Sequence, residues 1–397
     1  MNGARCPRGG EWKRLGDVAT VGAGNSAPQG DQYFIDGKYP FVRTQDVGRE
    51  KATICLVKTK DDINDLAVKD FNLKLWPAKT LLIPKSGEST FLNHRALLGK
   101  PSYVSSHLAT VMPSNGLLPE YLFFWSVILD SKKLTHDINY PSLRLSELES
   151  AKIPLPPLPT QRRIVSLLEK AEETKRLRAQ ADELTDRMLQ SVFLEMFGDP
   201  VRNPKGWEMA RLGELGEWTS GGTPSRTKPE YFQGTIPWFS TGELNDSYLL
   251  DSKEQITEEA LEVSSAKLFP KGTMLIGMYD SAAFKMGLLL CPASSNQACA
   301  AFIPKKETLE PLFALQLFKA MKPLFLSRRR GVRQKNLSQS IIKNFEIPLP
   351  PLPLQQEFAR IVEKVESMRQ SQNQSKQQIE DLFSALMQKA FRGELET

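Results

Sequence analysis

A seven-residue run rich in proline occurs twice in this chain and constrains its architecture more than any other feature. The run Ile-Pro-Leu-Pro-Pro-Leu-Pro spans residues 153–159 and returns at residues 347–353, 194 positions later. Each copy is followed, after one further residue, by a glutamine, Gln161 or Gln355. A period of this length is far longer than that of a solenoid repeat. The chain is therefore expected to contain two tandem copies of one whole domain, each with the segment that follows it.

Other short motifs repeat in the same order and keep nearly the same spacing. Leu15-Gly16-Asp17 aligns with Leu212-Gly213-Glu214, and Pro40-Phe41-Val42 aligns with Pro237-Trp238-Phe239, in both cases 197 positions apart. At the same offset Asp46 falls on Glu243. Insertions and deletions in surface loops readily cause such a drift from 197 to 194. The two halves are therefore predicted to share one fold.

Each half also carries the same succession of strand-like segments. Apolar runs at residues 80–84 and 273–278 have the length of strands, and second runs at 108–112 and 298–303 end at prolines. Helical patterns follow these runs, which indicates an α+β chain with two similar mixed α/β domains in a pseudo-two-fold repeat. The predicted parts are residues 1–152, the first domain; 153–200, a proline connector and long helix; 201–346, the second domain; and 347–397, the second connector and helix.

The prolines are predicted to separate each domain from a long helix. Proline fixes φ and pushes the preceding residue out of the helical region, so both runs should be stiff, extended connectors. A proline-rich ligand of an SH3-type domain is the alternative, but recurrence before a helix in both halves favours the connector. The first helix is predicted to run from Thr160, as the N-cap, to Phe197, and the second from about Leu354 to Phe391.

Both predicted helices carry a stripe of residues spaced by three and four, the pattern of a coiled coil. The stripe of the first helix consists of Leu167, Ala171, Thr174, Leu177, Ala181, Leu184 and Met188. That of the second consists of Phe358, Ile361, Val365, Met368, Gln372, Ser375, Ile379, Leu382 and Leu386. We expect the two helices to pack on each other as an antiparallel pair. The alternative is that each helix covers the core of its own domain.

Composition excludes few classes of protein. Hydrophobic residues make up 40% and charged residues 25% of the 397 positions, as in soluble globular proteins. The N-terminus does not resemble a signal peptide and no apolar run could span a bilayer, so a cytoplasmic protein is expected. The four cysteines lack CxxC spacing, which predicts free thiols and, with only three histidines, no metal centre. A net charge of +6 permits a nucleic-acid partner without requiring one.

Signatures of catalysis are missing from the sequence. It contains neither a P-loop nor a GxGxxG motif after a strand. Asn139-Tyr140-Pro141-Ser142 has the wrong order for an adenine methyltransferase motif, and Glu173-Thr174-Lys175, a nuclease-like Glu-x-Lys, lies in a charge-rich helical pattern. A duplicated chain without a duplicated acid, base, nucleophile or metal cluster points to binding rather than catalysis.

Polar and basic loops supply candidate contacts to nucleic acid. Lysine and arginine can neutralise phosphates, whereas Ser, Asn, His and Tyr can read base edges. The densest basic run, at residues 328–330, has no counterpart in the first half; a solvated helix end is the alternative for it. The candidates in the first half are Lys85, Ser86, Ser89, Asn93, His94 and Arg95. Those in the second half are Thr223, Ser225, Arg226, Lys228, Tyr279, Ser281, Lys285, Arg328, Arg329, Arg330, Arg333 and Lys335.

The order of these motifs resembles that of the specificity (S) subunits of type I restriction–modification systems. A variable domain, the proline run with its glutamine and a helix ending at Met196-Phe197-Gly198-Asp199-Pro200 are followed by a second variable domain and the same run. The second helix ends in Lys389-Ala390-Phe391-Arg392-Gly393-Glu394-Leu395. Gly221-Gly222-Thr223-Pro224-Ser225 is also typical of the family; the first half has Gly24-Asn25-Ser26-Ala27-Pro28 instead.

The resemblance implies a non-catalytic DNA-recognition subunit. Each domain would be a target-recognition domain that reads one half of an asymmetric, bipartite site in double-stranded DNA. The helices would set the half-site spacing and dock methyltransferase (M) subunits, and restriction (R) subunits would join them. S-adenosylmethionine, ATP and magnesium would bind to those partners rather than to this chain. The alternative is a helical adaptor or scaffold protein without DNA binding. The residues expected to form the docking helices are Leu167, Leu177, Leu184, Met188, Ile361, Val365, Ile379, Leu382 and Leu386.

Overall fold

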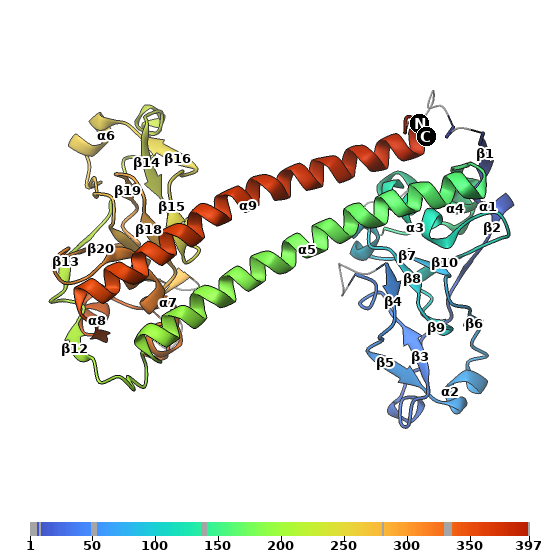
Figure 1. Cartoon of the computed structure of the whole chain (residues 1–397), viewed down its shortest axis with the longest axis horizontal. Helices are drawn as coiled ribbons and strands as arrows, with labels where there is room; N and C mark the ends of the chain where they lie inside the picture. Colours follow the sequence, from blue (N-terminus) through green and yellow to red (C-terminus); the bar gives the residue numbers. More distant parts are fainter. Residues whose placement is uncertain are drawn as a thin grey trace. The chain divides into compact units, whose positions relative to one another are not determined.

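The computed structural model describes residues 6–7, 9–48, 54–135, 141–279, 282–328 and 336–395. The chain divides into two compact units: unit 1, Met1–Ala181 with Gln372–Thr397, and unit 2, Asp182–Ser371. The division falls inside both long helices, α5 (Leu158–Phe197) and α9 (Leu352–Arg392). Each unit therefore contains the beginning of one long helix and the end of the other (Figure 1).

The described residues of unit 1 form three sheets. The largest has the strand order β2-β10-β7-β8-β4, the second has the order β5-β3-β9-β6, and the smallest pairs β1 with β11. The second sheet lies at the end of the unit that is remote from the long helices (Figure 1). The strands are β1 (Glu11–Arg14), β2 (Ala19–Ala23), β3 (Tyr39–Val42), β4 (Cys55–Leu56), β5 (Asp61–Ile63), β6 (Leu75–Trp76), β7 (Leu81–Pro84), β8 (Ala96–Leu98), β9 (Ser102–Val104), β10 (Leu108–Pro113) and β11 (Lys152–Leu155).

Unit 2 repeats this topology with one strand fewer. Its sheets have the orders β13-β20-β17-β18-β15, β16-β14-β19 and β12-β21. Only β6 lacks a counterpart among the strands described in unit 2, so the prediction that the two halves share a fold is confirmed. The strands are β12 (Glu208–Arg211), β13 (Gly216–Ser220), β14 (Ile236–Phe239), β15 (Ser247–Leu249), β16 (Glu254–Ile256), β17 (Met274–Gly277), β18 (Met286–Leu289), β19 (Ser294–Ser295), β20 (Cys299–Pro304) and β21 (Glu346–Leu349).

Short helices complete both units. One longer helix in each unit, α3 (Pro119–Ile128) or α7 (Pro311–Ser327), begins with a proline in its first turn, where the missing N–H costs no hydrogen bond. The remaining helices are α1 (Leu15–Val18), α2 (Asp65–Asp70), α4 (Leu145–Ser150), α6 (Glu258–Glu262) and α8 (Gln339–Lys343). Buried aromatic residues of α3 and α7, such as Trp125 and Phe318, pack with the strands in the main core of each unit.

The long helices run antiparallel within each unit and form part of its core. In unit 1, Ile164 and Leu168 near the start of α5 share a buried cluster with Phe391 at the end of α9. In unit 2, the ring of Phe358 near the start of α9 lies 5.4 Å from the ring of Phe197 at the end of α5. Antiparallel pairing is thereby confirmed. The alternative also holds in part, because the same helix ends cover the core of each unit.

Only the last two residues of each proline run are helical: three residues in a strand and two in neither element precede them, so the predicted extended connector is correct except at its end. Strands β11 and β21 contain the first part of the runs and pair with β1 and β12. Helix α5 then begins at Leu158, two residues before the predicted N-cap Thr160, and α9 begins at Leu352. Pro159 and Pro353 are tolerated there because first-turn N–H groups have no partner within the helix.

The stripe predicted to form the seam of α5 is mostly wrong: Ala171 and Ala181 are half-buried, but its large apolar residues lie on the exposed face. Leu167, Leu177, Leu184 and Met188 are 38%, 53%, 63% and 48% exposed. The buried face contains Gln161, Ile164, Val165, Leu168, Leu189, Phe193 and Phe197 instead. Positions three and four apart share one side of a helix, and the buried side chain of Gln161 fixes which side faces the core.

The seam predicted for α9 is correct in part. Phe358 and Val365 are buried, and Ile361, Ile379 and Leu386 are half-buried. Met368 and Leu382 are 53% and 59% exposed, while Val362, absent from the predicted stripe, is buried. Buried Gln355 and Phe358 set this face, and Val362 and Val365 lie on the same side because they follow at intervals of four and three.

Candidate nucleic-acid interface

Matching hydrogen bonds establish which residues of the two units are counterparts. In unit 1 the carboxylate of Asp46 accepts hydrogen bonds from the backbone N–H groups of Arg43, at 2.9 Å, and Lys60, at 3.2 Å. In unit 2 the carboxylate of Glu243 accepts from the N–H groups of Ser240, at 2.9 Å, and Lys253, at 2.8 Å. The alignment of Asp46 with Glu243 is thus confirmed, and Arg43 and Ser240 occupy the same place.

A glycine turn near the second sheet is also the same in both units. The N–H of Asn25 donates to Val104 O and that of Gly222 donates to Ser295 O, both at 2.8 Å. A Cβ on Gly24 would lie 2.0 Å from Val104 O, and a Cβ on Gly221 would lie 2.1 Å from Ser295 O. Only glycine permits this approach of two backbones. The run 24–28 therefore takes the place that Gly221-Gly222-Thr223-Pro224-Ser225 has in unit 2.

A polar cleft of about 640 Å³ lies beside this turn in unit 1. Its walls come from the turn, from the residues after β3 and from the residues after β9. Hydroxyl, amide, imidazole and guanidinium groups together offer both donors and acceptors, as a surface that reads base edges requires. The cleft is lined by Ser26, Ala27, Gln29, Arg43, Thr44, Gln45, Phe71, Ser105, Ser106 and His107.

Arg43 is the cationic residue of this cleft. Its Nε lies 2.6 Å from Asp61 Oδ2 and forms an ion pair with it. The Nε–H group does not make a hydrogen bond with a described residue. Its guanidinium carbon lies 5.7 Å from the centre of the Phe34 ring and 5.5 Å from that of Phe41. Attraction between the cation and both ring faces adds to the ion pair and holds the guanidinium in place.

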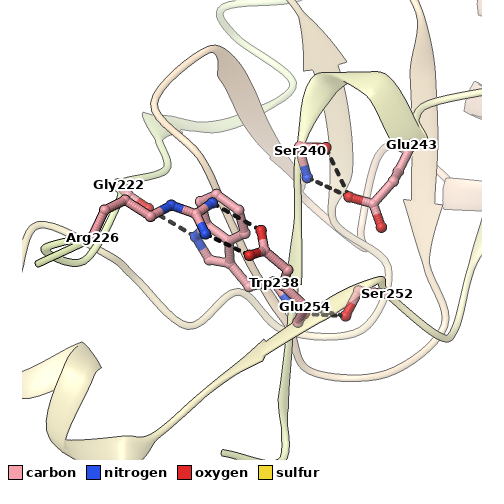
Figure 2. A network of polar contacts seen from close by, with 7 residues as sticks. All are labelled: Gly222, Arg226, Trp238, Ser240, Glu243, Ser252 and Glu254. Atoms are coloured by element: carbon pink, nitrogen blue, oxygen red, sulfur yellow. Dashed lines mark hydrogen bonds and ion pairs between the residues drawn. The ribbon is translucent and has the colours of Figure 1, made fainter. Parts of the chain in front are cut away.

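Unit 2 has a similar arginine, Arg226, in the loop after β13. Its Nη1 and Nη2 donate to both carboxylate oxygens of Glu254, at 2.5 and 2.8 Å, and it extends over the indole of Trp238 (Figure 2). The guanidinium carbon is 4.1 Å from the Phe232 ring centre and 5.2 Å from that of Trp238. The indole N–H of Trp238 donates to Gly222 O at 2.9 Å, which ties the ring to the glycine turn. The hydrogen bond from Arg226, and then its charge, hold the pKa of Glu254 below its usual value.

The candidates of the first half fall into two groups. The N–H of Lys85 donates to His107 O at 2.9 Å, so this lysine adjoins the cleft, and Ser86 and Ser89 follow it. Arg95, by contrast, is buried, and its guanidinium donates to Asn93, His94, Ser126, Leu129 and Ser131. Burial lowers the pKa of Arg95 to about 10, so it stays charged at neutral pH.

The DNA contact predicted for Arg95 is therefore wrong, because all of its donor groups point into the protein. Asn93 belongs to the same structural network, since its amide donates to Val127 O at 2.7 Å and its Oδ1 accepts from Arg95. His94 lies between them in the chain and is half-buried, and its carbonyl accepts a hydrogen bond from Arg95 at 2.7 Å. These residues connect the start of β8 to the end of α3 through hydrogen bonds.

The candidates of the second half lie mainly in loops. Thr223 donates to Gln297 at 2.5 Å, Ser225 bonds Thr227, and Lys228 donates to the hydroxyl of Tyr231 at 2.9 Å. Tyr279 is 45% exposed, Lys285 is half-buried, and Arg328, at the C-terminus of α7, is exposed beside Phe345. Outside the described residues lie Ser281, Arg329, Arg330, Arg333 and Lys335.

Sequence reasoning missed the cleft residues that follow β3 and β9, above all Arg43, Gln45, Ser105 and His107. The alignment of Asp46 with Glu243 could have located the first two, because it marks the loop that contains them. The predicted docking residues Leu167, Leu177, Leu184, Met188 and Leu382 are exposed, whereas Val365 is buried within unit 2 and is not accessible to a partner. Ile361, Ile379 and Leu386 are half-buried.

Two further features concern the described part of the chain. Among these residues no group of three or more His, Cys, Asp or Glu side chains could hold a metal ion, and the four cysteines are free. No helix in the described ranges is both long and apolar enough to cross a membrane.

Comparison with known proteins identifies the repeated unit. Residues 7–184 and 204–381 each match the type I restriction modification DNA specificity domain. The chain is 28% identical over 279 residues to the specificity subunit of the type I restriction enzyme EcoR124I/EcoR124II of Escherichia coli, covering 66% of this chain and 67% of that one. It is 32% identical over 167 residues to the MjaIX specificity subunit of Methanocaldococcus jannaschii, covering 41% and 38%.

Solved structures show the same fold. A chain from a structure describing complex assembly and conformational transition of a type I R-M system has a TM-score of 0.62 at 22% identity, with coverage of 98% of this chain and 100% of that one. The S subunit of a type I restriction–modification system from M. genitalium has a TM-score of 0.59 at 14% identity, with coverage of 98% and 97%. With its two matched domains and long helices, the chain belongs to the family of type I restriction–modification DNA specificity subunits.

Proposed function

We propose that this chain is the DNA-recognition subunit of a type I restriction–modification complex, in which each unit reads one half of a bipartite, asymmetric site. One observation supports this proposal above all others. The two units share their backbone hydrogen bonds around the second sheet but present different side chains there. Ser105 and Asn296 each donate a backbone N–H to the last residue of β3 or β14, at 2.9 and 3.0 Å, and so are counterparts.

Differences at counterpart positions are what two different half-sites require. The residues that follow are Ser106 and His107 in unit 1, and Gln297 and Ala298 in unit 2. Changing the donors and acceptors on a fixed backbone changes which base edges fit. The scaffold would position each half-site, and these side chains would specify its sequence.

The long helices supply the second part of the proposal. Exposed apolar residues on α5 and α9, among them Leu177 and Leu382, would dock the methyltransferase subunits, and restriction subunits would join that assembly. Those partners would contribute S-adenosylmethionine, ATP and magnesium, and this chain would contribute no catalytic group.

The test is to produce the chain together with its methyltransferase partner and to map methylated adenines in DNA exposed to the complex. A single bipartite, asymmetric consensus is expected, and none without this chain. The chain alone, incubated with S-adenosylmethionine and DNA, should transfer no methyl groups. A helical adaptor without DNA binding would instead leave the pattern of methylation unchanged when the chain is omitted, and that result would overturn the proposal.

A further inference from the structure

The two units place an arginine at the same point of the fold, but from different segments of the chain. Arg43 follows β3, whereas Arg226 lies in the loop after β13. The counterpart of Arg43 in unit 2 is Ser240. The loop of unit 1 that corresponds to that of Arg226, residues 26–32, contains neither arginine nor lysine. In the alignment of the two halves, neither arginine is therefore matched by an arginine of the other unit.

The surroundings of the two guanidinium groups are counterparts nonetheless. Asp61 pairs with Phe41 across the second sheet of unit 1, and Glu254 pairs with Trp238 in the same register in unit 2. The second ring belongs to Phe34 in unit 1 and to Phe232 in unit 2. The residue before each is a tyrosine, and the carbonyl of that tyrosine accepts a hydrogen bond at 3.1 Å from the first N–H after β5 or β16. The two phenylalanines are therefore counterparts. In both units, therefore, an arginine contacts one carboxylate and two aromatic rings at corresponding positions.

Each guanidinium keeps one edge for a further partner. In Arg226 the Nη1–Nη2 edge is bonded to Glu254, and no described residue is bonded to Nε or to the second N–H of Nη2. In Arg43 the ion pair involves Nε, and the Nη1–Nη2 edge has no bonded partner in the described ranges. Both side chains remain in reach of a ligand, since that of Arg43 is 32% exposed and that of Arg226 is 54% exposed.

A base edge fits this arrangement better than a phosphate does. The carboxylate beside each arginine compensates its charge, and it would repel a phosphate brought to the same guanidinium. A neutral acceptor pair meets no such repulsion, and guanine offers two acceptors, O6 and N7, spaced for one edge of an arginine. We propose that Arg43 and Arg226 each read a guanine, one in each half-site, through the guanidinium edge that the carboxylate leaves open; this inference rests on the proposed function.

The experiment compares methylation by the complete chain in complex with its methyltransferase partner, using a plasmid library with randomised sequence as the probe. The wild-type consensus should contain a G·C pair in each half-site. Arg226→Gln should lower the preference for that G·C pair roughly 5- to 160-fold in one half-site only, the range expected for one lost bidentate contact. Arg43→Gln should do the same in the other half-site only.

Two further variants separate base reading from a structural role of the arginine. Arg226→Gln combined with Ser240→Arg moves the arginine of unit 2 to the position that it has in unit 1, and should restore the preference for G·C. Arg211→Gln is the matched control. Arg211 is an exposed arginine of unit 2 whose Nε lies 3.5 Å from Glu346, and among the described residues it lies on no aromatic ring. It should leave the consensus unchanged.

Each outcome decides between the possibilities. A wild-type complex that shows no bipartite consensus would overturn the proposed function itself. A bipartite consensus without a G·C pair in one half-site, or one that Arg226→Gln leaves intact, would overturn the guanine inference alone. Loss of all methylation by Arg226→Gln and also by the double variant, with an unfolding temperature well below that of wild type, would assign the arginine to holding the sheet together and would equally overturn it.

Discussion

Gln161 and Gln355 hold the proline runs to the rest of their units through the same three hydrogen bonds. The Oε1 of Gln161 accepts from the N–H of Leu118 at 2.9 Å, and its Nε2 donates to Gly116 O and Pro156 O, both at 2.8 Å. Gln355 bonds Glu310 N, Thr308 O and Pro350 O at 3.0, 3.1 and 2.7 Å. Both glutamines are fully buried. The repeated glutamine of the sequence therefore joins a long helix to the start of α3 or α7.

We expect Gln355→Ala to destabilise unit 2. The substitution removes the partner of one N–H and one carbonyl that are partly buried and of one carbonyl that is buried, and a buried group left without a partner costs about 1–3 kcal/mol. The unfolding temperature should fall, and hydrogen exchange at the amide of Glu310 should become faster. Gln356→Ala, which alters the exposed neighbour, serves as the control and should change neither measurement. Unaltered exchange at Glu310 in the Gln355 variant would contradict this role.

Arg95→Met tests whether the buried arginine is structural. Its loss removes hydrogen bonds between a charged group and the carbonyls of Ser126, Leu129 and His94, each worth about 1.5–3 kcal/mol. The free energy of unfolding should therefore fall, while the dependence of DNA affinity on salt should keep its slope. The exposed Lys100→Met is the control for stability. A reduced salt slope in the Arg95 variant would show a phosphate contact after all.

Periodicity in the sequence predicted the repeat, the two long helices and their antiparallel pairing, but it gave the buried face of α9 only in part and that of α5 mostly wrongly. A stripe spaced by three and four was present on two sides of α5, one containing Leu177 and Leu184, the other Ile164 and Leu168. Hydrophobicity alone does not choose between them, because exposed apolar residues are common. The buried face is set by Gln161, two of whose three partners, Leu118 and Gly116, lie more than forty positions away in the sequence.

The residues of the candidate interface could be predicted only where they are neighbours in the sequence within one loop. Thr223 and Arg226 belong to one such loop. Arg43 and His107 are brought to one cleft by the parallel pairing of β3 with β9, which no local pattern reveals. Arg95 was misassigned for the converse reason, since two of the carbonyls that accept from its guanidinium, those of Ser126 and Leu129, belong to residues more than thirty positions away.

The ion pair of Arg226 and Glu254 predicts a dependence of stability on pH. Arg226 lowers the pKa of Glu254 in the folded chain, so the pair stabilises the fold above the usual glutamate value of 4.5 and this contribution is lost as the pH falls through the lowered pKa. The difference in unfolding temperature between wild type and Arg226→Gln should thus be constant near neutral pH and shrink in acid. Arg211→Gln controls for the lost charge. A difference that grows in acid would have the wrong sign.

The basic run at residues 328–330 should contribute phosphate contacts. Replacing Arg328, Arg329 and Arg330 with alanine removes three positive charges from the densest basic run of the chain. The slope of the logarithm of affinity against the logarithm of salt concentration should flatten by up to about 0.9 for each lost contact. Titrations of the complex with DNA at several salt concentrations give this slope, and the methylated sequence should stay the same. An unchanged slope would remove these arginines from the interface.

Lengthening both helices should lengthen the unread spacer between the half-sites. One heptad added at the exposed positions Gln180 and Gln374 keeps the buried faces set by Gln161 and Gln355 nearly in phase, because seven residues rotate the face by only about 20°. Each helix gains about 10.5 Å at 1.5 Å per residue, close to three base pairs at about 3.4 Å each. The half-sites should stay the same, because the reading residues are untouched.

Affinity for the lengthened site should nevertheless fall. Three additional base pairs rotate the second half-site by about 100° at roughly 10.5 base pairs per turn, so the DNA must untwist to meet both units. Mapping of methylated adenines by the variant complex measures spacer and half-sites together, and the same heptad added to α5 alone is the control, which should disturb helix pairing and lower methylation at every site. Should the doubly lengthened chain modify the original site at full rate, the helices would not set the spacing.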